Sequence, residues 1–277
     1  MNEEACPEEK LQHVFRSATD EPIPLFQERV DCLREAGRVL CKDFEGKFLN
    51  CIYNANYSAA ALVNLLAESF SCFRDETSFQ GRRVRLYKRA QILVADLWAC
   101  FNGESFGEFH DIDKITMFAG MGLAPMFYNS ISDQCLDYRI PQILHQLGCL
   151  VYSPPLTSHI RDLKPLPHGS TWEVELRATS IWCVELIRRE IELRHPGSQM
   201  RTKRQGSVDK SNTLSPEDDP ARKCSTQKHF KQKSVQEHKT SNVNAVLIDF
   251  FLYDTMKEIE AERQESIPHH RTRSIWY

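Results

Sequence analysis

The feature that most constrains the fold is the stretch VLIDFFLYD, which runs from Val246 to Asp254. Large apolar residues stand on both sides of Asp249, so a helix here is apolar around its whole circumference. Such a helix is buried among other elements rather than lying on a surface. A carboxylate carried into the core is costly unless it is paired or hydrogen-bonded. The stretch therefore predicts a central helix in a multi-helix domain, with Asp249 either a structural ion-pair partner or part of a functional site.

Helical periodicity recurs along most of the chain, and with 41% hydrophobic residues the 277-residue chain can bury a sizeable core. We expect helices over 24–44, 48–52, 58–73, 87–101, 141–148, 154–163, 170–193 and 243–264. Ser58 is a candidate N-cap, and Ser170 begins a capping-box pattern. The alternation of Trp172, Val174 and Leu176 also fits a strand, so the start of that helix stays open. These patterns predict a mostly α fold, with 1–195 and 243–277 forming one helical domain.

The segment 196–242 differs from the rest, because it is rich in Ser, Lys, Gln and Thr and nearly free of large apolar residues. It is predicted to be a disordered basic internal loop, since it cannot bury enough surface to offset its ordering entropy. The whole chain has 35 Lys and Arg and 38 Asp and Glu residues, and this segment holds 10 of the basic and 5 of the acidic ones. The rest of the chain therefore has 25 basic and 33 acidic residues, a net charge of −8. The folded part is therefore a poor match for duplex nucleic acid. The basic tract at 201–204 could attract RNA or an import receptor, although a solvating linker is the simpler reading.

The remaining composition points to a reduced intracellular protein without a metal or cofactor. The start of the chain is acidic and lacks the apolar core of a secretory signal, and no apolar run reaches membrane-spanning length. The ten cysteines form no C-x-x-C pair and no zinc spacing. We therefore expect free thiols, no membrane partner, and a cytoplasmic or nuclear location.

A second notable stretch is Asp137-Tyr138-Arg139-Ile140-Pro141. Because proline fits the first helical position and disfavours helix at the residue before it, the helix is predicted to begin at Pro141. Asp137 then lies in the preceding turn, where the positive end of the helix dipole favours an ionised carboxylate. A plain helix cap is the alternative reading. The glycine-containing stretch Gly120–Leu136 is predicted to be a loop inserted just before Asp137.

The charges in apolar surroundings suggest a kind of chemistry. Lys88 lies near the start of the helix predicted at 87–101 and Asp96 near its end, the reverse of what the helix dipole prefers, although a surface lysine is an equal reading. Asp137, Asp249 and Asp254 all lie near large apolar residues. An acid-lined aromatic pocket suits a flat heterocycle with cationic or N–H groups. It also suits a reaction that builds positive charge, such as cleavage of an N-glycosidic bond.

Several ordered blocks resemble the queuosine salvage protein family, the queuosine 5′-phosphate N-glycosylases (hydrolases). They are YKRAQILVADLW (87–98), DIDKITMFA (111–119), DYRIPQIL (137–144), SIWCVELI (180–187), LIDFFLYD (247–254) and the terminal IPHHRTRSIWY. The resemblance implies a fold similar to helical DNA glycosylases and a reaction that needs no metal. It implies hydrolysis of queuosine 5′-phosphate, which releases queuine for reuse in transfer RNA.

The resemblance also implies roles for individual residues. Asp137 matches the family's acid that acts as nucleophile or stabilises the ribosyl cation, and Lys88 matches the lysine beside it. Phe118 matches a phenylalanine that stacks on the base. Asp249 and Asp254 match the acids that hydrogen-bond the base and its cationic side arm.

Three departures from the family pattern bear on activity. Phe250 stands where relatives often have tyrosine, so one hydroxyl contact is expected to be absent. The 17 residues Gly120–Leu136 separate Ala119 from Asp137, which are neighbours in relatives, and the usual N-terminal portion is missing. A small displacement of a catalytic group can cost about a hundredfold in rate. We therefore expect an N-glycosidic hydrolase of reduced activity, with a catalytically inactive queuine-binding or scaffold form as the alternative. DNA repair, a third reading, rests on fold analogy alone.

Overall fold

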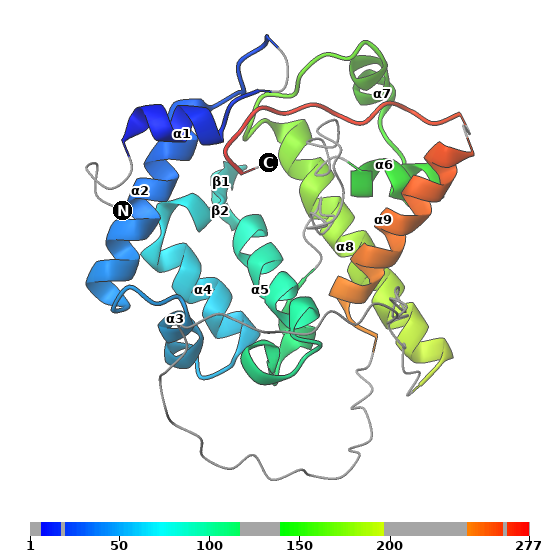
Figure 1. Cartoon of the computed structure of the whole chain (residues 1–277). Helices are drawn as coiled ribbons and strands as arrows, with labels where there is room; N and C mark the ends of the chain where they lie inside the picture. Colours follow the sequence, from blue (N-terminus) through cyan, green and yellow to red (C-terminus); the bar gives the residue numbers. More distant parts are fainter. Residues whose placement is uncertain (1–6, 18–19, 117–138, 197–242, 263–264, 277) are drawn as a thin grey trace, which may run out of the picture.

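The computed structural model describes residues 7–17, 20–116, 139–196, 243–262 and 265–276, and within them the protein is mostly α, as predicted (Figure 1). The helices are α1 (Glu8–Val14), α2 (Phe26–Asp43), α3 (Leu49–Asn54), α4 (Ala59–Ser69), α5 (Lys88–Cys100), α6 (Arg139–Gln146), α7 (Pro154–Arg161), α8 (Thr171–Arg194) and α9 (Ala245–Ala261). Three single 3-10 turns are η1 (Ser71–Phe73), η2 (Ser105–Gly107) and η3 (Ile112–Lys114). The strands β1 (Glu76–Phe79) and β2 (Arg82–Arg85) form an antiparallel hairpin. None of the described helices has both the length and the apolar character that crossing a bilayer would require.

Helix α9 lies between two packed groups of helices. Val246 belongs to a core cluster built mainly from α3, α4 and α5, and Phe250 packs against that cluster. Other α9 side chains, among them Ile248 and Leu252, form a second cluster with α6 and α8. Figure 1 shows α4 and α5 in one half of the molecule and α6, α8 and α9 in the other. Burial from two sides explains most of the apolar surface of α9. The expectation of burial around the whole circumference is wrong at Phe251, which is 59% exposed because it lies on the face that neither cluster covers.

The predicted capping signals act as expected. The Ser58 hydroxyl accepts a hydrogen bond from the Ala61 N–H at 3.0 Å at the start of α4. At the start of α8, the Ser170 hydroxyl accepts one from the Glu173 N–H at 3.4 Å, and the Glu173 carboxylate accepts one from the Gly169 N–H at 3.1 Å. The first bond satisfies a first-turn N–H group that the helix leaves unpaired, and the second holds the chain just ahead of the N-cap, as in a capping box. The region around Trp172 is therefore helical and not a strand.

Some predicted boundaries are wrong. Helix α6 already includes Arg139, so Pro141 is its third described residue rather than its first. Proline is tolerated there because the first-turn N–H groups have no partner within the helix. Leu147 and Leu163, which lie within the helices predicted over 141–148 and 154–163, are 50% and 45% exposed. Both lie beyond the last helical residue, where the chain leaves the helical path and the apolar stripe no longer continues.

Residues 265–276 run across several helices as an extended segment (red in Figure 1). The Gln142 amide of α6 donates to the Ile267 carbonyl at 2.7 Å. The Leu166 N–H donates to the Arg271 carbonyl at 2.7 Å, within a parallel bridge between Pro165 and Arg271. This C-terminal segment therefore joins α6 to the link between α7 and α8. The stretch Gly120–Leu136 and all but Pro196 of the predicted basic loop lie outside the described residues.

Candidate active site

Lys88 is the first residue of α5, and only 2% of it is exposed. The preceding Tyr87 adopts the left-handed conformation with φ of 49°, which turns the chain sharply into the helix. The Asp75 carbonyl accepts hydrogen bonds from Leu86 N–H at 3.0 Å and Tyr87 N–H at 3.2 Å, and its carboxylate accepts one from Lys88 N–H at 3.4 Å. Asp75 therefore fixes the chain at the point where Lys88 enters the interior.

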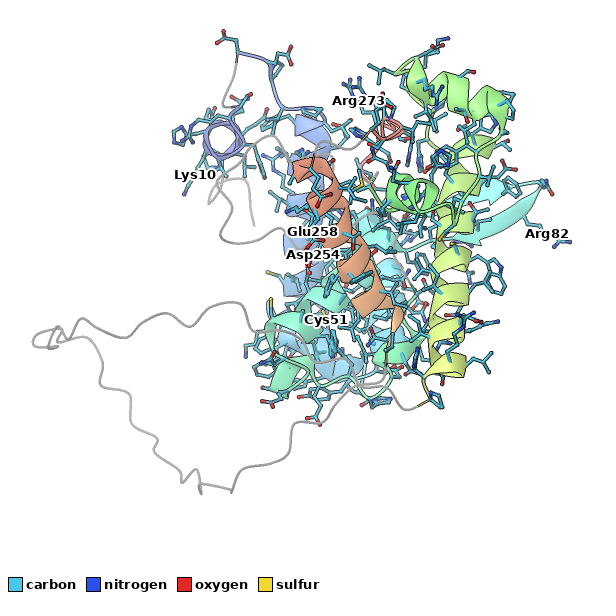
Figure 2. The ribbon with its side chains drawn as sticks, turned by 90° about the vertical axis from the view of Figure 1, so that its right-hand side faces the viewer. Lys10, Cys51, Arg82, Asp254, Glu258 and Arg273 are labelled. Carbon is cyan, nitrogen blue, oxygen red and sulfur yellow. The ribbon has the colours of Figure 1, made fainter. Side chains whose placement is uncertain are left out.

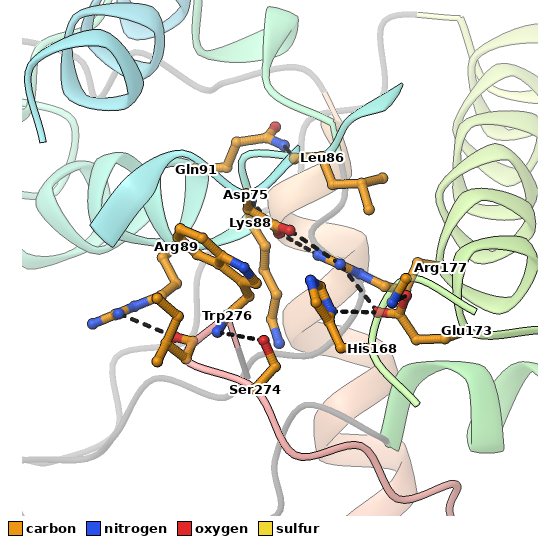
Figure 3. A network of polar contacts seen from close by, with 12 residues as sticks. Asp75, Leu86, Lys88, Arg89, Gln91, His168, Glu173, Arg177, Ser274 and Trp276 are labelled. Carbon is orange, nitrogen blue, oxygen red and sulfur yellow. Dashed lines mark hydrogen bonds and ion pairs between the residues drawn. The ribbon is translucent and has the colours of Figure 1, made fainter. Parts of the chain in front are cut away.

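A buried ionic network surrounds this point (Figure 3). The Arg177 guanidinium of α8 donates to both carboxylate oxygens of Asp75, at 3.1 Å for Oδ1, and to Glu173 Oε1 at 3.2 Å. Asp75 and Glu173 are fully buried, and Arg177 is 1% exposed. His168 Nδ1 lies 3.7 Å from Glu173 Oε1. Asp75 and Arg177, which are 102 positions apart, form this ion pair. Because Asp75 also accepts a hydrogen bond from the Lys88 N–H, the network ties α8 to the start of α5.

His270 of the C-terminal segment lies close to the same charges. It is 3% exposed, and burial is the main cause that lowers its pKa to about 3. The charges of His269, Lys88 and Arg177 lower the same pKa further. The imidazole is therefore neutral at physiological pH. Through His270, the C-terminal segment lies near the buried cations Lys88 and Arg177.

Helix α9 places the predicted residues Asp249 and Phe250 differently from Asp254. Asp249 is fully buried, as its apolar neighbours indicate, and Phe250 is partly buried against the first cluster. At about 100° per residue, Asp249 lies on α9 between Phe250 on one side and Leu252 on the other, and so faces the seam between the two clusters. Asp254 is exposed, together with Glu258 one turn later (Figure 2). The expectation that Asp254 lies in an apolar setting is therefore wrong, because the apolar sequence around it belongs to other faces of the helix.

The predicted residues Asp137 and Phe118 lie outside the described residues. The chain is described again from Arg139, which forms an ion pair with Glu260 of α9. One turn further, Ile143 and Leu144 are fully buried against α8 and α9. The helix that follows Asp137 is thus packed on the helix that carries Asp249.

A cavity of about 310 Å³ opens beside Lys88. It is lined by Phe73, Lys88, Arg89, Ile92, Leu93, Asp96 and Trp276. Burial raises the pKa of the Asp96 carboxyl from 3.8 to about 6. An apolar cavity with a few converging charges and a perturbed carboxyl is a typical ligand site.

Replacing Asp96 by asparagine should increase stability at neutral pH. The native pKa of Asp96 is above its unfolded value, so the native state binds more protons between pH 3.8 and 6 and loses stability as pH rises through this range. Because the side chain is partly exposed, we expect a gain on the order of 1 to 2 kcal/mol at pH 7.5. Urea unfolding at pH 7.5 and pH 3.8 measures it. A gain of equal size at both pH values would contradict the prediction.

The sequence did not identify Asp75, Glu173, Arg177 or His270 as parts of the site. The i, i+4 spacing of Glu173 and Arg177 was a visible signal, but such pairs are common on helix surfaces. Among the residues that the structure describes, no group of three or more His, Cys, Asp or Glu side chains is arranged to hold a metal ion.

Comparison with known proteins agrees with the sequence blocks. The family model described as queuosine salvage protein matches residues 1–277. Three relatives are named queuosine 5′-phosphate N-glycosylase/hydrolase. The protein of Nematostella vectensis is 38% identical over 267 residues, which cover 96% of this chain and 63% of the relative. The protein of Mus musculus is 37% identical over 270 residues, which cover 97% of this chain and 63% of the relative. The protein of Schizosaccharomyces pombe is 34% identical over 284 residues, which cover 100% of this chain and 64% of the relative.

The chain thus spans just under two thirds of the length of these relatives. The match itself extends over the whole chain, including α5 with Lys88 and α9 with Asp249. The protein therefore belongs to the queuosine salvage protein family.

Proposed function

We propose that this protein hydrolyses the N-glycosidic bond of queuosine 5′-phosphate and releases queuine. The observation that carries the proposal is the buried Lys88, held at the start of α5 by Asp75 and bordering a cavity. The names of the relatives support the same reaction.

In the proposed reaction the bond between the ribosyl carbon and the base nitrogen breaks, and its electron pair leaves with the base. The ribosyl carbon becomes positively charged, and a carboxylate beside it stabilises this charge. We assign that role to Asp137. Water then adds its hydroxyl to the ribosyl carbon, and its proton is transferred to the departing base. Lys88 adjusts the charge of Asp137, because an ammonium near a carboxylate keeps it ionised.

The base is proposed to be held by side chains from α9 and from the chain ahead of α6. Asp249 accepts hydrogen bonds from the heterocycle; it is fully buried, and a hydrogen bond to a carboxylate is stronger where water is excluded. Phe118 stacks on the base, and Phe250 adds apolar contact without the hydroxyl group of a tyrosine. Asp254 is proposed to contact the cationic side arm, and its exposure would place that arm towards solvent.

The direct test is incubation of the protein with queuosine 5′-phosphate, followed by chromatographic measurement of free queuine and ribose 5-phosphate. Both products should appear in equal amounts. Guanosine 5′-phosphate, which lacks the side arm, serves as a comparison substrate. If no queuine is released under conditions in which the mouse relative releases it, the proposed activity is wrong for this chain.

A second candidate is an inactive form that binds queuine without hydrolysis. The observation that favours it is the 17-residue stretch Gly120–Leu136 directly ahead of Asp137. Tight queuine binding without turnover, lost on Asp249→Ala, would support this candidate. Release of queuine would exclude it.

We also infer that the ligand is a small molecule rather than duplex nucleic acid, and that the protein acts in the cytoplasm. The acidic excess outside 196–242 supports the first inference, because it repels a phosphate backbone. The fold likeness to helical DNA glycosylases is part of the same proposal.

A further inference from the structure

Two cysteines from different elements lie against each other in the half of the molecule built from α6, α8 and α9. Cys149 follows the end of α6, and Cys183 lies in the middle of α8. The Cys183 thiol donates a weak hydrogen bond to the Cys149 carbonyl, with 3.9 Å between Sγ and O. Burial is the main cause that raises the pKa of the Cys183 thiol, and the neighbouring Cys149 thiol raises it further. The two sulfur atoms are therefore close enough to influence each other.

The turn that carries Cys149 is held rigidly. Gly148 has φ of 74°, the left-handed conformation that commonly ends a helix. The Cys149 N–H donates to the Leu144 carbonyl at 2.8 Å, and the Gly148 N–H donates to the His145 carbonyl at 3.0 Å, which together form a Schellman motif. The next residue, Leu150, packs against the core cluster of α6, α8 and α9. Cys149 is thus fixed beside α8 without being buried.

Exposure to solvent favours this pair over another pair of neighbouring cysteines. Cys149 is exposed and Cys183 is half-buried, so a small oxidant reaches the first thiol and finds the second beside it. Cys32 and Cys72 also lie near each other, but Cys72 is buried, and burial raises its pKa to about 11. Because the thiolate is the form that attacks an oxidant, such a thiol reacts slowly. Cys149 and Cys183 are therefore the better placed of these two described pairs.

We propose that Cys149 and Cys183 form a reversible disulfide when the protein meets a peroxide. The Cys149 thiolate attacks one oxygen of hydrogen peroxide, the O–O bond breaks, and the departing hydroxide takes up the proton that this thiol released. The Cys183 sulfur then attacks the sulfur of the resulting sulfenic acid, the S–O bond breaks, and the hydroxide leaves as water with the Cys183 proton. Two thiols are oxidised to one disulfide, and one hydrogen peroxide is reduced to two molecules of water. A dithiol reverses the reaction by thiol–disulfide exchange.

The disulfide links the end of α6 to α8 and closes a loop that contains α7. Cys149 and Cys183 are 34 positions apart. Closing a loop of this size removes conformational freedom from the unfolded chain and so stabilises the native fold. The melting temperature of the oxidised protein should be about 5 to 10 °C above that of the reduced protein. Neither cysteine takes part in the proposed hydrolysis, so the disulfide can be tested apart from it.

The test treats the native, reduced protein with hydrogen peroxide, blocks the remaining thiols with N-ethylmaleimide and identifies the tryptic peptides by mass spectrometry. Trypsin places Cys149 in the peptide 140–161 and Cys183 in the peptide 178–188, and each peptide has a single cysteine. The two peptides should appear joined, at the sum of their masses less two hydrogen atoms. Dithiothreitol should separate them and return the melting temperature to that of the reduced protein.

Three variants serve as controls. Cys149→Ser and Cys183→Ser should each abolish both the joined peptide and the rise in melting temperature. In Cys183→Ser the sulfenic acid of Cys149 lacks its partner thiol, so dimedone should label it. Cys41→Ser removes an exposed thiol of α2 and should change none of these results.

Three results would overturn the proposal. The first is peroxide modification of Cys149 in the wild-type protein without the joined peptide. The second is a Cys149 thiol that stays reduced under peroxide that modifies Cys41. The third is a rise in melting temperature that persists in Cys183→Ser.

Discussion

Lys88→Met should lower kcat for queuosine 5′-phosphate by at least about a hundredfold, the loss typical of removing one preorganised charge from a water-excluded site. Methionine is similar in length and apolar, so it fills the space of the lysine stem but supplies no charge. Because Lys88 is 2% exposed, bulk water cannot take the place of its ammonium group. Steady-state rates of queuine release, measured at saturating substrate, give the loss in kcat.

Two comparison variants show whether the loss comes from the charge at this place. Lys164→Met removes an exposed lysine that pairs with Asp162, and it should keep full activity. Lys88→Arg retains the positive charge with a different shape and should retain more activity than Lys88→Met. Circular dichroism and thermal melting establish that each variant is folded. A folded Lys88→Met variant with wild-type kcat would remove Lys88 from the mechanism.

Arg177→Met should reduce the free energy of unfolding by about 3 to 5 kcal/mol, the usual cost of removing one partner from a buried ion pair. Asp75 and Glu173 are fully buried, and without the guanidinium both carboxylates lose the cation that they share. Urea unfolding at pH 7.5, followed by circular dichroism, measures the change.

A control on the same helix separates burial from the mere loss of an arginine. Arg188 pairs with Glu185 and Glu192 on the surface of α8, and Arg188→Met should cost no more than about 1 kcal/mol. The triple change Asp75→Asn, Glu173→Gln and Arg177→Met removes all three charges and should recover much of the loss. Equal losses in the free energy of unfolding for Arg177→Met and Arg188→Met would show that the buried network stabilises the fold no more than a surface ion pair does.

The sequence predicted those parts of the fold that depend on neighbouring residues. The caps at Ser58 and Ser170, the start of α5 near Lys88 and the burial of Asp249 all follow from residues within one or two turns. The start of α6 was misplaced because proline is compatible with several positions of a first turn. The helices predicted over 141–148 and 154–163 extended too far, because a periodic pattern does not show where a helix ends.

The ionic network could not be predicted because its members come together only in the folded chain. Asp75 precedes the hairpin, Arg177 lies in the middle of α8, and His270 belongs to the C-terminal segment. Nothing in the sequence near any of them indicates the others. Asp96, which lines the cavity beside Lys88, stood out only as a carboxylate at the unfavourable end of a helix dipole, which is a small effect. The position of Asp96 in the lining of a cavity, and its partial burial there, became apparent only from the packing of Phe73 and Trp276.

The attachment of residues 265–276 to α6, to the link before α8 and to α5 has a consequence for biosynthesis. These residues leave the ribosome after every helix that they join, and contacts between distant parts of a chain form slowly. A nascent chain can therefore assemble its helical core before Trp276 is in place to line the cavity beside Lys88. Ligand-binding ability should consequently be acquired late, after the last of these residues has emerged.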